Sequence, residues 1–185
     1  MPHPFLCPWW LTWTFDNPVR RLIHDPQRIV GPFVHPGDMV ADIGCGMGHF
    51  SLGLARAVGP SGRVLAIDLQ ARQLEAVNRR AAREGLQSRI ETRAAQPAEP
   101  LPLPPGIAFA LAFWMLHEVP GVDAFLAQVR DSLAPGGTFL VVEPSVHVGR
   151  AQFDDEVARA KAAGFSATPL TGIRFSRAVL LRRAG

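Results

Sequence analysis

Apolar runs of strand length alternate along this chain with segments whose apolar residues recur every three or four positions. The runs predict strands, and the periodic segments predict helices. We expect strands at 39–43, 63–68, 89–92, 106–113, 138–143, 165–170 and 174–182, and helices at 50–58, 70–84, 122–133 and 151–163. This alternation predicts right-handed parallel crossovers, and therefore an α/β fold with a doubly wound sheet and helices on both faces.

The first 33 residues differ from the rest in composition. Residues 1–16 carry three of the four Trp and two Phe among three Pro, which excludes a long helix. These rings either fill a groove on the outer face of the sheet or form a lid over a bound ligand. A shallow membrane contact through the Trp pair is a third possibility, but it lacks the basic amphipathic helix that usually accompanies one.

The chain is one domain by its length of 185 residues. Within it we expect an aromatic and proline-rich cap segment at 1–33 and the folded domain at 34–185. Asn17-Pro18 predicts a short helix from Val19 to about His24, limited by Pro26 and Pro32.

Between the first predicted strand and helix lies Asp42-Ile-Gly-Cys-Gly-Met-Gly48, with glycine at every second position. Such glycines let the backbone adopt positive φ and approach a ligand, and the following helix directs its unpaired N–H groups at the loop. The spacing differs from the Gly-x-Gly-x-x-Gly of hydride-transfer dinucleotide domains. An acid just before the glycines would repel a pyrophosphate, but it suits a ligand that carries an ammonium group.

The second predicted strand, 63–68, ends at Asp68, 20 positions after Gly48, where a ribose diol would need a carboxylate acceptor. Together the two stretches resemble the class I S-adenosylmethionine-dependent methyltransferases. The first motif of that family is a hydrophobic run followed by Asp/Glu-x-Gly-x-Gly-x-Gly, and its second motif ends in an acid.

The resemblance covers about residues 34–183, and it implies a Rossmann-like, seven-stranded sheet whose antiparallel last strand lies beside the fifth. It also implies S-adenosyl-L-methionine as the cofactor, with contacts from Asp42, Gly44, Cys45, Gly46, Gly48, Asp68 and Leu69. Many relatives carry Asp after Phe in the fourth strand and an acid near the adenine. This chain has Phe109-Ala110 and only Glu99 there, so we expect backbone N–H groups and apolar walls such as Leu69 to hold the base.

Residues after the fourth strand are candidates for chemistry, because ligands of open α/β sheets bind outside the carboxyl ends of the strands. His117 could act as a general base or orient the acceptor, with Glu118 beside it. The alternative, that both residues cap the next turn, remains open. Glu143 and His147 are weaker candidates facing the same crevice.

The acceptor class is suggested by the stretch from Trp114 to Glu118. Enzymes that methylate base amines in nucleic acid often have Asn/Asp-Pro-Pro-aromatic at this place. The stretch here is closer to methyltransferases of small molecules, including quinone and lipid precursors. A wall of Trp114 and Met115 would suit a flat or apolar acceptor.

Composition excludes a disordered chain, since 48% of the residues are hydrophobic and 19% charged. A net charge of +3 could indicate a nucleic-acid partner, but arginines such as Arg72, Arg79, Arg80 and Arg83 favour a solvated helix face. Cys7 and Cys45 form neither a disulfide framework nor a metal motif, and His3, His24, His35 and His49 lack metal-ligand spacing.

No apolar run approaches the roughly 20 residues of a membrane span, and the N-terminus lacks a signal peptide, so we expect a cytoplasmic protein. The expected partner is a small-molecule acceptor, and the oligomeric state is left open.

Two other functions are considered as alternatives to methyl transfer. A nicotinamide-dependent oxidoreductase is disfavoured by the glycine spacing and the absence of Tyr. A non-catalytic or regulatory protein that binds S-adenosylmethionine remains an alternative.

Overall fold

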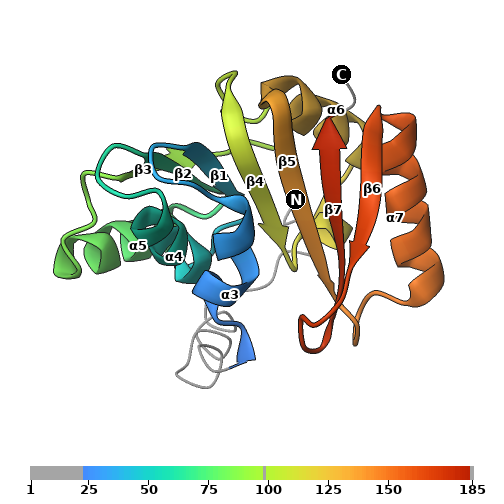
Figure 1. Ribbon diagram of the computed structural model, residues 1–185, viewed down its shortest axis with the longest axis horizontal. Coiled ribbons are helices and arrows are strands. Elements are labelled where there is room, and N and C mark those ends of the chain that lie inside the picture. The colour runs from blue at the N-terminus through green and yellow to red at the C-terminus, as the bar shows by residue number, and fades with distance from the viewer. Residues whose placement is uncertain (1–22, 98, 184–185) are drawn as a thin grey trace.

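A computed structural model describes residues 23–97 and 99–183. Seven strands of the described residues form one sheet in the order β3-β2-β1-β4-β5-β7-β6 (Figure 1). The strands are β1 (Met39–Ile43), β2 (Arg63–Asp68), β3 (Ile90–Ala94), β4 (Ile107–Phe113), β5 (Leu133–Pro144), β6 (Phe165–Leu170) and β7 (Ser176–Arg183). The helical elements are α3 (Pro26–Val30), η1 (Gly31–Phe33), α4 (His49–Ala57), α5 (Ala71–Arg83), η2 (Leu116–Glu118), α6 (Val122–Ser132) and α7 (Arg150–Ala162).

Strands β1 to β5 are mutually parallel, and β7 lies antiparallel between β5 and β6. The opposite directions of the β5 and β7 arrows are visible in Figure 1. This confirms the predicted doubly wound, mostly parallel sheet with an antiparallel last strand beside the fifth. Since β6 and β7 follow each other without a helix, they can pair as an antiparallel hairpin.

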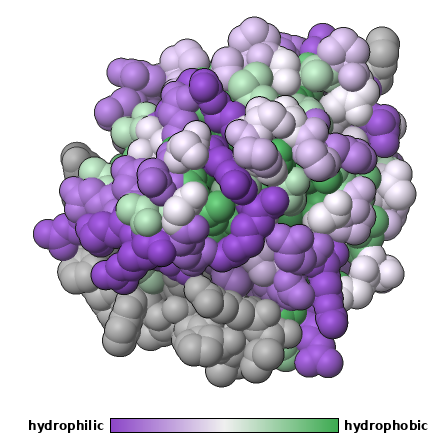
Figure 2. Space-filling view, turned by 60° about the vertical axis from the view of Figure 1, so that its left-hand side comes forward, coloured by the Kyte–Doolittle hydropathy of each residue, from purple (hydrophilic) through white to green (hydrophobic). Residues whose placement is uncertain are grey.

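The sheet separates two apolar layers because successive side chains of a strand point to opposite faces. Val40, Phe109 and Leu140 join α3, α4 and α5 in one buried cluster. Their neighbours along the strands, such as Ala41 and Phe139, join α6 and α7 in the other. The outer surface of the α4–α5 side, brought forward in Figure 2, is mostly hydrophilic with apolar residues in small areas.

The site is positioned by the junction between β1 and β4. The chain leaves β1 toward α4 on one face, but it leaves β4 toward α6 on the other. Parallel pairing aligns Ile43 with Ala112, so the glycine loop and the segment after β4 begin at the same edge of the sheet. In open α/β sheets this junction is where ligands bind.

Two elements differ from the sequence predictions. Pro26 begins a helix instead of only limiting one, because Asp25 caps α3 by accepting a hydrogen bond from the Gln27 amide at 2.9 Å. The stretch 134–137, which falls between the helix expected at 122–133 and the strand expected at 138–143, belongs to β5. The register jumps from Ile107–Leu133 to Phe109–Thr138, so the strand accommodates its Pro and Gly residues in an irregularity.

The predicted cap segment at 1–33 is described only in part. The Trp residues at 9, 10 and 13 lie outside the described residues, and so does most of the helix expected at 19–24. Val30 is fully buried, and Phe33 stacks on Phe109 with ring centroids 6.0 Å apart, so α3 and η1 contribute to the core. No helix in the described ranges is long and apolar enough to cross a membrane.

One carboxylate lies inside the layer between α7 and the sheet. Glu156 is 6% exposed and contacts a space lined by apolar residues such as Leu116, Val141 and Phe153. Its Oε1 accepts a hydrogen bond from Gln152 at 3.3 Å, but its Oε2 is buried without a hydrogen-bond partner among the described residues. Burial and the charge of Glu143 raise the pKa of Glu156 to about 7.

This buried acid predicts a pH-dependent stability. Because the pKa of Glu156 is about 7 in the fold and roughly 4.3 in an unfolded chain, the protonated carboxyl stabilises the fold at low pH. That contribution is lost as the pH rises through 7. We expect Glu156→Gln to increase the free energy of unfolding by about 2 kcal/mol near pH 9, with the difference vanishing toward pH 4.

Denaturant unfolding across this pH range measures the effect. Asp154→Asn, on the exposed side of the same helix, is the matched control and should change stability by less than about 0.5 kcal/mol. A Glu156→Gln variant whose stability difference from the native chain is the same at both ends of the range would contradict the assignment.

Candidate cofactor and acceptor site

The glycine loop adopts the left-handed backbone that its sequence predicts, with φ of 70° at Gly44 and 52° at Gly46. Its amides are engaged within the chain. Those of Gly44 and Cys45 donate to the Ile67 carbonyl at 2.8 and 3.0 Å, and that of Gly48 donates to the Cys45 carbonyl at 3.0 Å. These three amides are therefore already hydrogen-bonded, because those of Gly44 and Cys45 fasten the loop to β2 and that of Gly48 closes a turn within the loop.

The side of the loop that remains open is at Gly46. A Cβ at Gly44 would lie 2.8 Å from Met115 Cγ, and one at Gly48 would lie 3.0 Å from Val77 Cγ2. A Cβ at Gly46 would meet no atom of the described residues within 4 Å. The missing side chains at Gly44 and Gly48 thus let the loop pack against the segment after β4 and against α5, and Gly46 is left open toward the described part of the chain.

Asp68 joins the loop to the start of α5. Its Oδ2 accepts from the Gly46 amide and its Oδ1 from the Gln70 amide, both at 2.9 Å. Each carboxylate oxygen can accept two hydrogen bonds, so capacity for a ribose diol remains. Burial raises the pKa of Asp68, and the amides of Gln70, Gly46 and Leu69 oppose that rise.

Asp42 lies beneath the loop and not on its open side. Its carboxylate is buried, and its Oδ2 accepts from the Ser51 hydroxyl of α4 at 2.6 Å. Burial, together with Asp42 and Asp68, raises the pKa of the Cys45 thiol well above its ordinary value, which keeps it protonated. Two carboxylates therefore flank the loop and give it a negative potential.

The roles of Asp42 and Cys45 as ligand contacts stay predictions. The cytoplasmic location also stays a prediction.

Leu69 and Arg80 complete this part of the site. Leu69 directly follows Asp68 and is 45% exposed, so an apolar face is available beside the carboxylate. Arg80 of α5 donates to the Met47 carbonyl at 2.7 Å. The sequence placed Arg80 on a solvated face, and this expectation is wrong, because its guanidinium holds the glycine loop.

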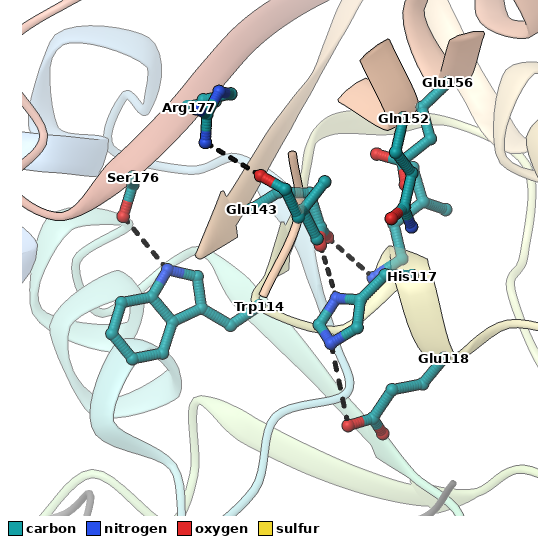
Figure 3. A network of polar contacts seen from close by, with 10 residues as sticks. Trp114, His117, Glu118, Glu143, Gln152, Glu156, Ser176 and Arg177 are labelled. Atoms are coloured by element: carbon teal, nitrogen blue, oxygen red, sulfur yellow. Dashed lines mark hydrogen bonds and ion pairs between the residues drawn. The ribbon is translucent and has the colours of Figure 1, made fainter. Parts of the chain in front are cut away.

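His117 is held by a second set of carboxylates (Figure 3). Its Nδ1 is hydrogen-bonded to Oε2 of Glu143, which is fully buried at the end of β5, and Glu143 Oε1 accepts from the Leu116 amide at 2.9 Å. On the other side, His117 Nε2 lies 3.9 Å from Glu118 Oε1. With Glu143 accepting at Nδ1, the ring presents Nε2 away from the buried acid.

The carboxylates also set the ionisation of this group. Burial lowers the pKa of His117, but the hydrogen bond and charge of Glu143, with Glu118 and Glu156, outweigh it and raise the pKa above the ordinary value. Burial raises the pKa of Glu118, which His117 opposes, while Glu143 and Asp68 raise it further. Asp68 is thus close enough for its charge to act on Glu118.

Trp114 forms the wall between β4 and β7. It has a φ of 62°, which is uncommon for an aromatic residue, and its Nε1 donates to Ser176 Oγ at 3.0 Å. Such strain persists where surrounding contacts enforce it, and here the Trp114 amide also donates to the Val142 carbonyl at 2.7 Å. These bonds join Trp114 to β5 and β7, while the next residue, Met115, packs on Gly44 of the glycine loop.

Of the candidate residues, the fold brings His117, Glu118 and Glu143 together and leaves His147 exposed on the loop after β5. The weakly ranked Glu143 is the direct partner of His117. Parallel pairing of Phe113 with Val142 could have indicated this, because residues just beyond that pair must lie close together. His24 and His49 are structural, since His24 is hydrogen-bonded to the Arg174 carbonyl and His49 to the His24 carbonyl.

A fold like this one is found in a solved S-adenosylmethionine-dependent methyltransferase from Aquifex aeolicus. The two superimpose with a TM-score of 0.84 over 96% of this chain and 99% of that chain, at 20% sequence identity. At this identity the likeness shows the shared fold alone.

Two relatives that are similar in sequence are also named as methyltransferases. The chain is 31% identical to a demethylmenaquinone methyltransferase of Symbiobacterium thermophilum, over 60% of this chain and 44% of that protein. It is 33% identical to a ubiquinone/menaquinone biosynthesis C-methyltransferase of Hahella chejuensis, over 75% of this chain and 54% of that protein. The chain thus spans about half the length of these curated relatives.

The family model described as a methyltransferase domain matches residues 40–137, which run from β1 through the glycine loop, Asp68 and His117 to the start of β5. This range is more than half of the chain, and it contains the glycine loop, Asp68 and the His117–Glu118 segment, while Glu143 lies beyond it. The family resemblance inferred from the glycine loop and Asp68 is confirmed, and the chain belongs to the methyltransferase domain family.

Proposed function

We propose that this chain binds S-adenosylmethionine and transfers its methyl group to a small, flat, apolar acceptor. One observation carries the proposal: the Asp68 carboxylate is anchored on the Gly46 amide, directly beside the space that a side chain at residue 46 would enter. A carboxylate next to an unobstructed backbone suits a ribose diol that lies against the loop.

The residues around the loop fit the rest of this cofactor. Asp42, Asp68 and Glu118 place negative charge near the glycines, which favours the cationic sulfonium and ammonium groups. The half-exposed side chain of Leu69 can pack against a planar base. Loop carbonyls and carboxylates would make the polar contacts, because the amides of Gly44, Cys45 and Gly48 are engaged in the fold.

When bound, the sulfonium supplies the electrophilic methyl group, and the protein supplies alignment and proton removal. Met115 packs on Gly44, so the wall that would contact the acceptor touches the loop that would hold the cofactor. This contact fixes the distance between the two reactants. Trp114 and Met115 offer apolar surface for a ring-shaped acceptor.

His117 is the base in this proposal. Glu143 orients the imidazole through Nδ1, so Nε2 can take a proton from an acidic acceptor as the methyl group is transferred. Glu118 adds negative charge near Nε2 and stabilises the imidazolium that forms. Because the relatives are named for quinone methylation, we extend a reduced quinone as the acceptor class to this chain.

The cofactor half of the proposal predicts a binding defect in Asp68→Asn. The amide keeps one acceptor oxygen but loses the charge, and charge-assisted hydrogen bonds contribute about 1.5–3 kcal/mol each. We expect the dissociation constant for S-adenosylmethionine to rise at least about tenfold in calorimetric titration. Asp131→Asn, an exposed residue of α6, is the control and should bind like the native chain. Native-like affinity in a folded Asp68→Asn variant would overturn the assignment.

The role of His117 as the base predicts how turnover depends on pH. Since the pKa of His117 is raised and only neutral imidazole accepts a proton, turnover should increase as the pH rises through a midpoint above the ordinary value. Glu143→Gln removes the partner that stabilises imidazolium, so this midpoint should shift to lower pH and kcat should fall roughly 100-fold.

Turnover is measured as S-adenosylhomocysteine released with reduced demethylmenaquinone as the acceptor, and thermal unfolding identifies variants that are not folded. His117→Gln should abolish the pH midpoint. A folded Glu143→Gln variant whose midpoint is unchanged would show that Glu143 does not act through His117.

A further inference from the structure

Two loops at the edge of the sheet form one continuous surface, which we name the basic rim: residues 145–150 between β5 and α7, and residues 171–175 between β6 and β7, with Ser176 and Arg177. The Ser145 amide donates to the Phe175 carbonyl at 2.9 Å. Arg177 donates to the carbonyls of Ser145 and Val148 at 3.3 and 2.8 Å. These bonds tie the loops together, so the rim has a defined shape.

The rim exposes large apolar side chains. Val146 is 81% exposed and Phe175 is 62% exposed, and in the described part of the chain only Leu69 joins them as an exposed large hydrophobic residue. Phe175 has a φ of 56°, a conformation that disfavours a bulky residue. By contrast, Val148 in the same loop is buried. The backbone thus holds Val146 and Phe175 outward while neighbouring residues pack inward.

The two loop segments that carry these side chains are rich in basic residues. Segments 144–152 and 171–177 contain Arg150, Arg174, Arg177 and His147 but no Asp or Glu. The 13-residue helix α7 begins here after Gly149, without a side-chain cap and without an acid in its first turn. The positive end of a helix favours an acid at this place, yet the chain has Arg150. Helix end and guanidinium groups therefore add to the same positive potential.

The rim borders the acceptor half of the site. It directly follows Glu143, which holds His117, and its Ser176 accepts the hydrogen bond from Trp114 (Figure 3). In Figure 1 the β5–α7 and β6–β7 loops lie at the same end of the sheet as the carboxyl end of β4. Whatever contacts the rim is therefore close to the turn that carries His117.

We propose that the basic rim docks on an anionic lipid surface. Val146 and Phe175 enter the boundary between headgroups and acyl chains, while Arg150, Arg174 and the amino end of α7 contact headgroup phosphates. The exposed apolar side chains match the acyl chains of such a surface, and the arginines match its phosphates. A nucleic acid would satisfy the arginines, but it would leave Val146 in water.

Docking in this orientation would bring the turn that carries His117 to the lipid. An acceptor dissolved in the bilayer could then reach His117 without crossing bulk water. This consequence rests on the proposed methyl transfer, but the docking itself does not. A binding measurement without cofactor or acceptor therefore tests the rim separately from the activity.

The test is flotation of the full-length protein with vesicles of phosphatidylcholine alone or of phosphatidylcholine mixed with phosphatidylglycerol. We expect binding to the mixed vesicles only. Val146→Ser combined with Phe175→Asn should weaken the binding by about tenfold or more, because the inserted apolar area is lost. Asparagine tolerates positive φ, so the variant should fold, which circular dichroism verifies.

The charge contribution has a matched control. Arg150→Gln with Arg174→Gln should weaken binding by about tenfold. Arg79→Gln with Arg83→Gln removes the same charge from the exposed side of α5 and should leave binding unchanged. The proposal is overturned if the native chain does not bind mixed vesicles, or if the Val146/Phe175 variant binds like the native chain. Binding to single-stranded RNA in place of vesicles would also overturn it, in favour of a nucleic-acid surface.

Discussion

Carboxylates at the ends of parallel strands, buried for Asp42 and Glu143 and partly buried for Asp68, are the constraint on which this molecule depends. Asp42 lies near the end of β1, Asp68 ends β2, and Glu143 lies near the end of β5. A buried carboxylate is costly unless donors satisfy it. Here the Ser51 hydroxyl donates a hydrogen bond to Asp42. The Gly46 and Gln70 amides donate to Asp68. Glu143 accepts from the Leu116 amide and is hydrogen-bonded to His117. The same hydrogen bonds that stabilise these acids therefore shape the loops of the site.

This arrangement connects the cofactor half and the acceptor half. Asp68 fixes the glycine loop, Gly44 packs against Met115, and Met115 precedes the His117 turn that Glu143 holds. This path joins the two halves of the site through packed atoms. Asp68 also raises the pKa of Glu118 through space, so the halves are coupled electrically as well. Methyl transfer needs such fixed geometry, because the protein contributes mainly alignment.

The sequence predicted the parts that local patterns determine. Apolar runs located the strands within a few residues, and the glycine spacing with Asp68 identified the family. The pairing of His117 with Glu143 depends on the register of β4 against β5, which no local pattern contains. The engaged amides of the glycine loop depend on the Ile67 carbonyl of a neighbouring strand, and the role of Arg80 depends on how α5 lies against that loop. These are tertiary relations, and only coordinates reveal them.

Native mass spectrometry detects directly whether a cofactor lies against the open face of Gly46. Binding at this place predicts that the purified native chain carries one S-adenosylmethionine or S-adenosylhomocysteine per chain, or acquires it when S-adenosylmethionine is added. It also predicts that Gly46→Ala remains folded but carries none, because the added methyl group fills that space. A native chain that binds no adenosyl compound, or a Gly46→Ala variant that binds it equally, would contradict the account.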